Sequence, residues 1–319
     1  MVSDKKLADV SAYYKIHGKK KTQKFFNLSD ESISRYLRRA KEHLVDDVKP
    51  SDVLRRISEK YTAKELQAIA SGGRLVPGMA KVPVISFEGK RIRFCLSGDW
   101  HLGSLFTDPD RIYQMYEEVE KEGCEFIANG GDIVEGMSNR AGHIYELSHL
   151  GYNEQKKHAV DVISQSPVPM FGISGNHDRW FIKSAGADIG ADIERELGKD
   201  KFTFLGHDEG DISLNGHAVL KLWHGEDGNT YAISYRVQKI IESITGGEKP
   251  DILSCHHVHK FAHLFLRHIH AISAGSMQSQ SKWMRGKRIE AHTGFVIVDA
   301  VINKDGVAKC GVTWYPFYT

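Results

Sequence analysis

Five short clusters of Asp, Asn and His residues lie along the sequence, each at the end of an apolar stretch. They offer carboxylate, amide and imidazole groups, and no thiolate is needed to complete them. Mixed oxygen and nitrogen ligands suit Mn²⁺, Fe or Zn better than Ca²⁺ or a structural zinc. One cation would not use so many ligands, whereas two cations bridged by a shared carboxylate would. The clusters are residues 97–103, 130–136, 172–178, 222–225 and 255–259.

The spacing within the clusters supports this interpretation. Asp99 and His101 stand two residues apart, so on extended backbone both side chains point to one side and can bind the same cation. Asp132, which follows two glycines, is the natural bridge between two cations. His224 precedes Gly225 at the end of an apolar strand, a context that favours a ligand over an ordinary surface histidine.

The elements that would position these clusters begin near residue 84, where apolar strands start to alternate with amphipathic helices. This alternation indicates an α/β sandwich. In open α/β folds, binding sites gather beyond the carboxyl ends of strands, where the clusters fall. The strands are expected over 126–128, 168–173, 219–223 and 252–254, and the helices near 109–122, 152–165, 187–198 and 231–245.

Two further β features are predicted at the ends of this region. Residues 84–87 and 92–96 are apolar and enclose Glu88-Gly89-Lys90, which predicts a β-hairpin. Short β segments over 262–314 close the chain and are expected to form a second sheet.

The first 45 residues have a different character and are expected to form a separate helical module. Residues 1–41 carry eleven basic and four acidic side chains, a net charge of +7, although the whole chain has +2. Such a basic arm usually meets a polyanion. Helices are predicted over 6–16, 22–28 and 31–40, with Asn27 ending the second and Ser29 or Asp30 capping the third.

The second and third of these helices resemble a helix-turn-helix DNA-binding unit. In such units the second helix enters the major groove while basic side chains hold phosphates. Residues 1–45 are therefore expected to bind DNA or another nucleic acid. The alternative is a solvated helical hairpin that docks on the rest of the protein or on a partner. Residues 46–83 are expected to be a helical connector without chemistry of its own.

Composition places the chain among ordinary globular proteins, and we expect a cytoplasmic location. Residues 1–6 lack the apolar core of a secretory signal, and no apolar run approaches the roughly 18–20 residues that span a bilayer. The sequence leaves homo-oligomerisation open. The four cysteines form no CxxC pair and are expected to be buried and reduced: Cys95, Cys124, Cys255 and Cys310.

Taken in order, the five clusters resemble the D-x-H, GD-x-x-E, GNHD, H and GH-x-H motifs of the calcineurin-like metallophosphoesterases. The resemblance covers roughly residues 85–300. It implies a four-layer α/β/β/α sandwich over 84–319 and two divalent cations, with Mn²⁺ expected and Fe, Zn or Ni as alternatives. The ligands that it implies are Asp99, His101, Asp132 and His259 for the first cation, and Asp132, Asn176, His224 and His257 for the second.

The same resemblance implies a mechanism. A hydroxide shared by the two cations attacks phosphorus, and His177, which is not a ligand, acts as the general acid while Asp178 orients its ring. One position departs from the family pattern, because His256 stands where a glycine usually precedes the first His of the fifth motif. This leaves open whether His256 or His257 is the ligand.

Two resemblances bear on the substrate. The first motif, through Ser104, is similar to that of SbcD-type repair nucleases and of the small exonuclease subunit of archaeal family D DNA polymerase. Residues 274–280 and 282–295 resemble the closing segment of the latter, with Met277 in place of Trp. A DNA exonuclease or endonuclease is therefore favoured. Candidate contacts to the nucleic-acid backbone are Arg179, Lys282, Arg285, Lys287 and Arg288.

Two alternatives stay open. One is a phosphodiesterase or phosphatase that acts on small or cyclic nucleotides. The other is a DNA-binding protein with a vestigial phosphoesterase body. A protein Ser/Thr phosphatase is disfavoured, because those enzymes carry Arg after the second motif and Glu after GNH, where this chain has Gly136 and Asp178.

Overall fold

The computed structural model describes residues 4–37, 83–226, 232–245 and 248–318. The chain divides into two compact units, Met1–Leu75 and Val76–Thr319. Among the helices in the described ranges, none has the combination of length and apolar character that a bilayer crossing requires. The predicted connector, residues 46–83, lies almost entirely outside the described residues.

The first unit contains α1 (Asp4–Phe26), which is interrupted at Gly18, whose φ of 73° is not helical. The two helices predicted over 6–16 and 22–28 therefore appear as the two halves of α1. Asn27 follows with a left-handed φ of 52°, as predicted for the residue that ends this helix. The Ser29 hydroxyl accepts the Ser32 N–H at 3.3 Å and so caps the helical residues 30–37.

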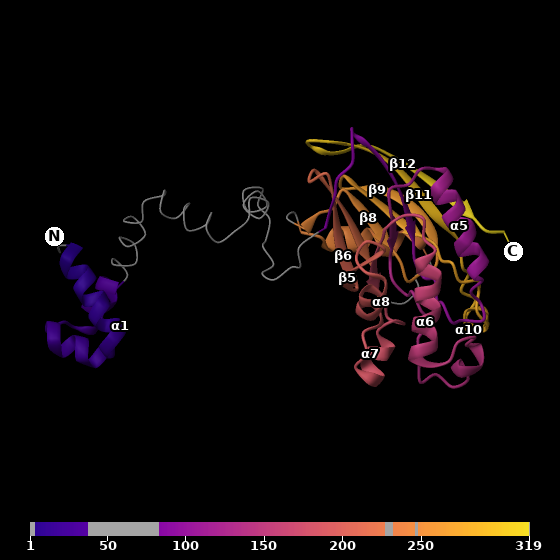
Figure 1. Ribbon diagram of the computed structural model, residues 1–319. Coiled ribbons are helices and arrows are strands. Elements are labelled where there is room, and N and C mark those ends of the chain that lie inside the picture. The colour runs from indigo at the N-terminus through magenta and orange to yellow at the C-terminus, as the bar shows by residue number, and fades with distance from the viewer. Residues whose placement is uncertain (1–3, 38–82, 227–231, 246–247, 319) are drawn as a thin grey trace. The chain divides into compact units, whose positions relative to one another are not determined.

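The second unit is built on two six-stranded sheets (Figure 1). In spatial order, the first sheet consists of β1 (Val84–Ile85), β6 (Glu209–Leu214), β7 (Ala218–Trp223), β8 (Ile252–Cys255), β10 (Ile269–Ala274) and β9 (Phe261–Leu266). The second consists of β12 (Gly306–Pro316), β11 (Gly294–Asn303), β2 (Arg91–Ser97), β3 (Ile127–Asn129), β4 (Met170–Ser174) and β5 (Phe202–His207).

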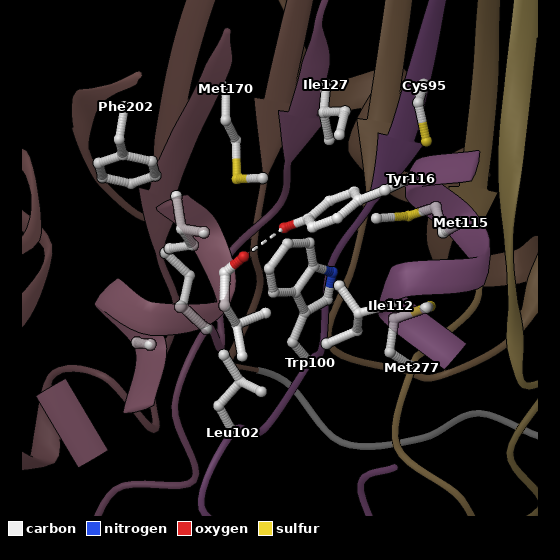
Figure 2. Packing of buried hydrophobic residues seen from close by; sticks show 14 of the residues in the cluster. Cys95, Trp100, Leu102, Ile112, Met115, Tyr116, Ile127, Met170, Phe202 and Met277 are labelled. Atoms are coloured by element: carbon white, nitrogen blue, oxygen red, sulfur yellow. Dashed lines mark hydrogen bonds between the residues drawn. The ribbon is translucent and has the colours of Figure 1, made fainter. Parts of the chain in front are cut away.

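Three apolar clusters hold four layers together, as the predicted sandwich requires. Phe94, Leu96, Leu220 and Ile252 belong to the cluster between the two sheets. A second cluster, part of which is shown in Figure 2, packs helices on the outer face of the second sheet, and a third packs α9 on the first sheet. The helices are α5 (Pro109–Lys121), α6 (Gly151–Ser164), α7 (Trp180–Ala185), α8 (Ile189–Leu197), α9 (Ile233–Ser243), α10 (Lys282–Gly286) and the 3₁₀ helix η1 (His143–Glu146).

Two sequence predictions about the sheets were wrong. Residues 84–96 do not form a hairpin, because β1 pairs in parallel with β6 in the first sheet whereas β2 lies between β3 and β11 in the second. The Asn215 side chain holds β1 beside the β6–β7 turn, through its contacts with the Phe87 backbone N–H (2.9 Å) and carbonyl (3.1 Å). Residues 262–314 likewise do not form one sheet, since β9 and β10 belong to the first and β11 and β12 to the second.

Candidate metal centre

The polar clusters lie at the carboxyl ends of strands from both sheets. In the second sheet β2, β3 and β4 run parallel, and in the first β7 and β8 do. The loops after β2 and β3 stay paired beyond the strands, because the N–H groups of Asp99 and His101 donate to the carbonyls of Gly131 and Asp132, both at 2.9 Å. The five clusters therefore converge on one edge of the sandwich.

One group of candidate ligands consists of Asp99, His101 and His259. One ligand atom from each lies within 4.8 Å of the others. The Nε2 atoms of His101 and His259 are 3.1 Å apart, and His259 Nε2 is 3.4 Å from Asp99 Oδ1. All three side chains are buried. This arrangement offers one carboxylate and two imidazoles to a single cation.

A second group consists of Asp132, His224 and His257, and again one ligand atom from each lies within 4.8 Å of the others. His224 Nε2 lies 3.2 Å from Asp132 Oδ2 and 3.2 Å from Asn176 Oδ1. Asp132 Oδ2 is also 3.8 Å from His101 Nε2, a member of the first group. The structure thus brings all seven predicted ligand residues together with Asp132 between the two groups, and their roles as ligands stay predictions.

The structure distinguishes His256 from His257. The His257 ring belongs to the second group, whereas the buried His256 ring lies against the backbone of Gly98 and Gly130, with Nε2 at 2.8 Å from Ser254 Oγ. A Cβ at Gly130 would stand 1.8 Å from His256 Cδ2, and one at Gly98 2.4 Å from His256 Nδ1. Gly98 in the first motif and Gly130 in the second therefore leave space for the His256 ring. His256 is the residue that stands where the fifth motif usually has glycine.

We expected the Asp178 carboxylate to contact the His177 ring, but in the structure of these two described residues it does not. His177 Nδ1 lies 2.7 Å from the carbonyl oxygen of Glu135 instead. The buried Asp178 carboxylate accepts the backbone N–H groups of Ile133, Val134 and Gly175 at 2.9–3.2 Å. Asp178 therefore fastens the second motif to the third, and the main chain of Glu135 orients His177.

The candidate ligands stand on unusual backbone. Left-handed φ angles between 49° and 80° occur at five of the seven, a conformation that costs a residue with a Cβ about 1–2 kcal/mol. Such strain persists where the surrounding structure fixes it, and it gathers at functional sites. These residues are Asp99, His101, Asp132, His257 and His259.

Both aspartates favour the ionised form despite their burial. Burial works against ionisation, yet the nearby imidazoles hold the pKa of both carboxyls below the usual range. His259 has the largest such effect on Asp99, and His224 on Asp132. Both carboxyls therefore favour the ionised form as long as a positive charge lies beside them.

The pKa values of the nearby imidazoles shift in opposite directions. Burial opposes protonation of His101 and His224, but carboxylates raise the pKa of each to about 9, chiefly Glu135 for His101 and Asp132 for His224. Burial lowers the pKa of His257 to about 4. Positive charge is thus favoured beside the aspartates, where a metal cation can supply it in place of a proton.

A cavity of about 400 Å³ opens over the two groups. Candidate ligands and His177 form its floor, and its walls include Arg140, Trp180 and Trp283. The Trp180 ring lies against the His177 ring, with centroids 3.9 Å apart. A cavity of this volume can hold one phosphate with the groups attached to it.

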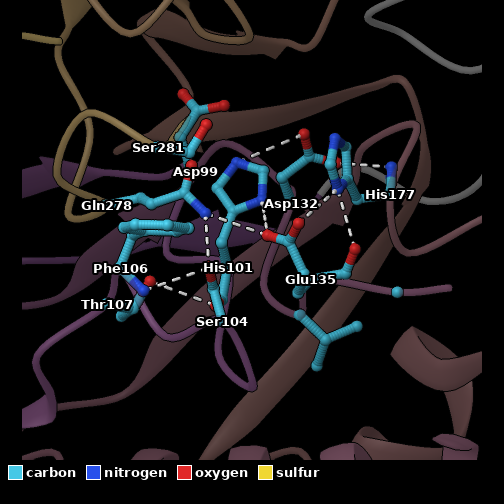
Figure 3. Close-up of polar contacts among 12 residues, drawn as sticks. Asp99, His101, Ser104, Phe106, Thr107, Asp132, Glu135, His177, Gln278 and Ser281 are labelled. Atoms are coloured by element: carbon cyan, nitrogen blue, oxygen red, sulfur yellow. Dashed lines mark hydrogen bonds and ion pairs between the residues drawn. The ribbon is translucent and has the colours of Figure 1, made fainter. Parts of the chain in front are cut away.

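Sequence reasoning did not identify three residues that contact the centre. Glu135 lies within the second motif, His143 is in η1, and Gln278 follows β10 (Figure 3 shows Glu135 and Gln278). Glu135 was visible as the last letter of GD-x-x-E, and Gln278 belongs to the segment that resembles the polymerase subunit. No local pattern marks His143, because its importance depends on folding against Glu135.

The donor set fits two divalent cations. Each group supplies carboxylate oxygen and imidazole nitrogen, the mixture that Mn²⁺, Fe and Zn accept. Nδ1 of His259 is buried without a hydrogen-bond partner among the described residues, so burial of this ring has to be offset in another way, such as ligation by its Nε2. Glu135 forms a third set with His101 and His177, but its carboxylate is already surrounded by N–H groups.

Comparison with known proteins agrees with this geometry. The family described as calcineurin-like phosphoesterase matches residues 92–300. Among curated proteins, none has a sequence that matches significantly.

Similar solved structures include an archaeal phosphodiesterase (12% identity, TM-score 0.42, covering 70% of this chain and 100% of that one). A predicted phosphoesterase from Streptococcus pneumoniae has 10% identity and a TM-score of 0.35, covering 70% and 98%. GAP50, the anchor in the inner membrane complex of Plasmodium, has 11% identity and a TM-score of 0.46, covering 72% and 85%.

The family match spans most of the chain and contains all five clusters. Its members use divalent cations to hydrolyse phosphate esters, which is the chemistry that the donor set, the buried charge and the cavity provide. This protein belongs to the calcineurin-like phosphoesterase family.

Proposed function

We propose that this protein is a cation-dependent phosphodiesterase that cleaves nucleic acid, with DNA as the expected substrate. The observation that carries this proposal is the composition of one wall of the cavity. Ser281, Trp283, Met284 and Ile289 line the cavity, while basic residues of the same segment are exposed to solvent. The exposed basic residues are Lys282, Arg285, Lys287 and Arg288.

Such a wall suits a strand better than an isolated phosphate. Exposed Lys and Arg side chains hold successive phosphates without reading the sequence. Trp283, whose surface is 45% exposed, offers a face on which a base can stack. Arg179 does not join this surface, because its guanidinium pairs with Asp208 at 2.6 Å and with Glu226.

The reaction divides between cations and side chains. When bound, two divalent cations lower the pKa of a shared water and neutralise charge on phosphoryl oxygens. Asp132 would contribute to both sites, with the two groups of ligands on either side. Because His177 Nδ1 donates to the Glu135 carbonyl, Nε2 is the nitrogen left to give a proton to the leaving oxygen.

The first unit supports the same substrate class. Its described surface exposes Lys19, Lys20, Lys21, Lys24 and Arg35. We propose that residues 1–45 increase affinity for nucleic acid without taking part in the chemistry. Deleting them is expected to weaken DNA binding at least tenfold and to leave the hydrolysis of a small diester unchanged.

The test compares strands with small esters. Purified protein and Mn²⁺ are incubated with end-labelled single- and double-stranded DNA, with bis-p-nitrophenyl phosphate and with cyclic nucleotides. The proposal expects shortened DNA products, and expects Asp132→Asn to abolish them. Hydrolysis of the small esters with intact DNA would contradict it and favour a small-nucleotide phosphodiesterase.

A charge-reversal pair tests the basic wall itself. Lys282→Glu combined with Arg285→Glu should raise KM for DNA by about tenfold and flatten its salt dependence, since each lost phosphate contact reduces the salt slope by about one. KM for bis-p-nitrophenyl phosphate should stay unchanged. Lys304→Glu, at an exposed residue between β11 and β12, is the matched control.

A further inference from the structure

The Glu135 carboxylate lies beside side-chain nitrogens of His101, His143 and Gln278. His143 Nε2 lies 2.8 Å from Oε1, and His101 Nδ1 and Gln278 Nε2 each lie 2.9 Å from Oε2. All four residues are buried, with at most 5% of their surface exposed. A carboxylate accepts and does not donate, so His143 and Gln278 direct an N–H toward Glu135, whereas His101 Nδ1 lies beside it as an ion-pair contact.

This arrangement fixes the tautomer of His143 and the orientation of the His101 ring. Nδ1 of His143 accepts the Ser138 N–H at 3.2 Å, which places the ring hydrogen on Nε2, facing Glu135. His101 Nδ1 lies on the side of the Glu135 carboxylate, so Nε2 is the nitrogen on the side of His259, with the two Nε2 atoms 3.1 Å apart. A carboxylate behind a ligand histidine typically orients the ring and makes it a better donor.

Gln278 connects the same carboxylate to the cavity wall (Figure 3). Its amide nitrogen donates to Glu135 and also to Ser104 Oγ at 3.0 Å. Two residues earlier, the Ser276 hydroxyl donates to the Asp99 carbonyl at 2.9 Å. The segment that begins at Ser276 and continues into the basic wall therefore holds both Asp99 and, through Glu135, His101.

We propose that Glu135 and Gln278 are positioning residues that set the cation affinity of the site formed by Asp99, His101 and His259. The inference rests on the proposed ligand role of His101, and it does not require that DNA be the substrate. A glutamine in place of Glu135 has one acceptor oxygen for the three neighbouring nitrogens, and its own NH₂ would face one of them. His101 would then lose its fixed orientation.

The test is Mn²⁺ titration of the full-length protein by calorimetry, with Glu135→Gln, Gln278→Ala and the control Gln280→Ala. The Gln280 side chain is exposed, and its amide donates to the Ile289 carbonyl at 2.7 Å. We expect Glu135→Gln to weaken one of two Mn²⁺ sites by about 10–100-fold. Gln278→Ala should weaken the same site less, and Gln280→Ala should bind both cations as the wild type does.

Turnover provides a second readout that a merely structural role would not move. For bis-p-nitrophenyl phosphate, kcat of Gln278→Ala should return to the wild-type value at saturating Mn²⁺, with KM unchanged. Thermal unfolding in EDTA shows whether each variant is folded. Equal weakening of both Mn²⁺ sites, or unchanged Mn²⁺ affinity in folded Glu135→Gln and Gln278→Ala, would overturn the proposal. Intact DNA in the earlier assay would overturn only the nuclease function.

Discussion

Strand β2 has a charged cluster at each end, and the two differ in almost every physical respect. At its start, Arg91 and Arg93 contact Asp299 on β11, with Arg93 Nε at 3.1 Å from Oδ2, and Arg93 also reaches Glu122 at 3.3 Å. These side chains are 29–62% exposed. Beyond its end lie Asp99 and His101, which are buried.

The first cluster is neutralised by its own members, two cations against two carboxylates, with water completing the solvation. The second gathers carboxylates and imidazoles without a fixed cationic side chain among the candidate ligands, on left-handed backbone. Opposite charges at the surface add a little stability. The buried carboxylates and imidazoles instead favour the binding of cations. The strained backbone at these residues helps to hold the ligands together. The contrast predicts opposite consequences for mutations at the two ends.

The largest expected effect is at the shared aspartate. Asp132→Asn should lower turnover of bis-p-nitrophenyl phosphate by about a thousandfold or more, since losing a bridging ligand removes several kcal/mol of transition-state stabilisation. Bound Mn²⁺, measured by mass spectrometry of dialysed protein, should fall in parallel. Thermal unfolding in EDTA checks that the variant is folded, and Asn at this position tolerates the left-handed backbone. Full metal content in an inactive variant would contradict the bridging role.

His177→Ala is expected to separate chemistry from metal binding. Both Mn²⁺ ions should stay bound, while turnover of esters with poor leaving groups falls by about 10²–10⁴-fold. Esters with good leaving groups should lose much less, because they depart without a proton. Loss of Mn²⁺ from this variant would show that His177 is a ligand rather than an acid.

A smaller effect tests the backbone strain. His257 has a φ of 80°, a conformation that glycine adopts without steric strain and alanine does not. In EDTA, His257→Gly should be more stable than His257→Ala by about 1 kcal/mol in urea denaturation. At Gln114, exposed in α5, the order should reverse by a similar amount, since helix interiors favour alanine over glycine. If the same one of the two variants, glycine or alanine, were the more stable at both positions, backbone strain would not be a property of the metal centre.

The smallest effect belongs to the surface cluster. The hydrogen bond from Arg91, opposed by burial and assisted by Arg93, lowers the pKa of Asp299 to about 2 from 3.8. A carboxyl with a lowered folded-state pKa stabilises the protein above its unfolded value and loses that contribution as pH falls through the folded one. Asp299→Asn should therefore cost about 1 kcal/mol at pH 6, after screening, and progressively less as the pH falls through about 2. A cost that stays the same as the pH falls through this range would argue against an electrostatic origin.

Much of the fold could be predicted because strand and helix periodicity are local properties. The strands over 168–173 and 219–223, for example, are β4 and β7 within two residues. The errors came from pairing. Residues 84–87 and 92–96 look like hairpin partners, but β1 pairs with β6, more than a hundred residues away, and β2 pairs with β3 and β11.

The sequence by itself determined which side chains could bind cations and in what order they follow the strands, since ligand chemistry and the position after a strand can both be read from neighbouring residues. The tertiary structure decided which of His256 and His257 faces the second group, and that the Glu135 carbonyl rather than Asp178 contacts His177. It also decided that Gln278 meets Glu135 across 143 residues of chain. The reason is physical: such contacts depend on strand register and on how loops close, and no local pattern encodes either one.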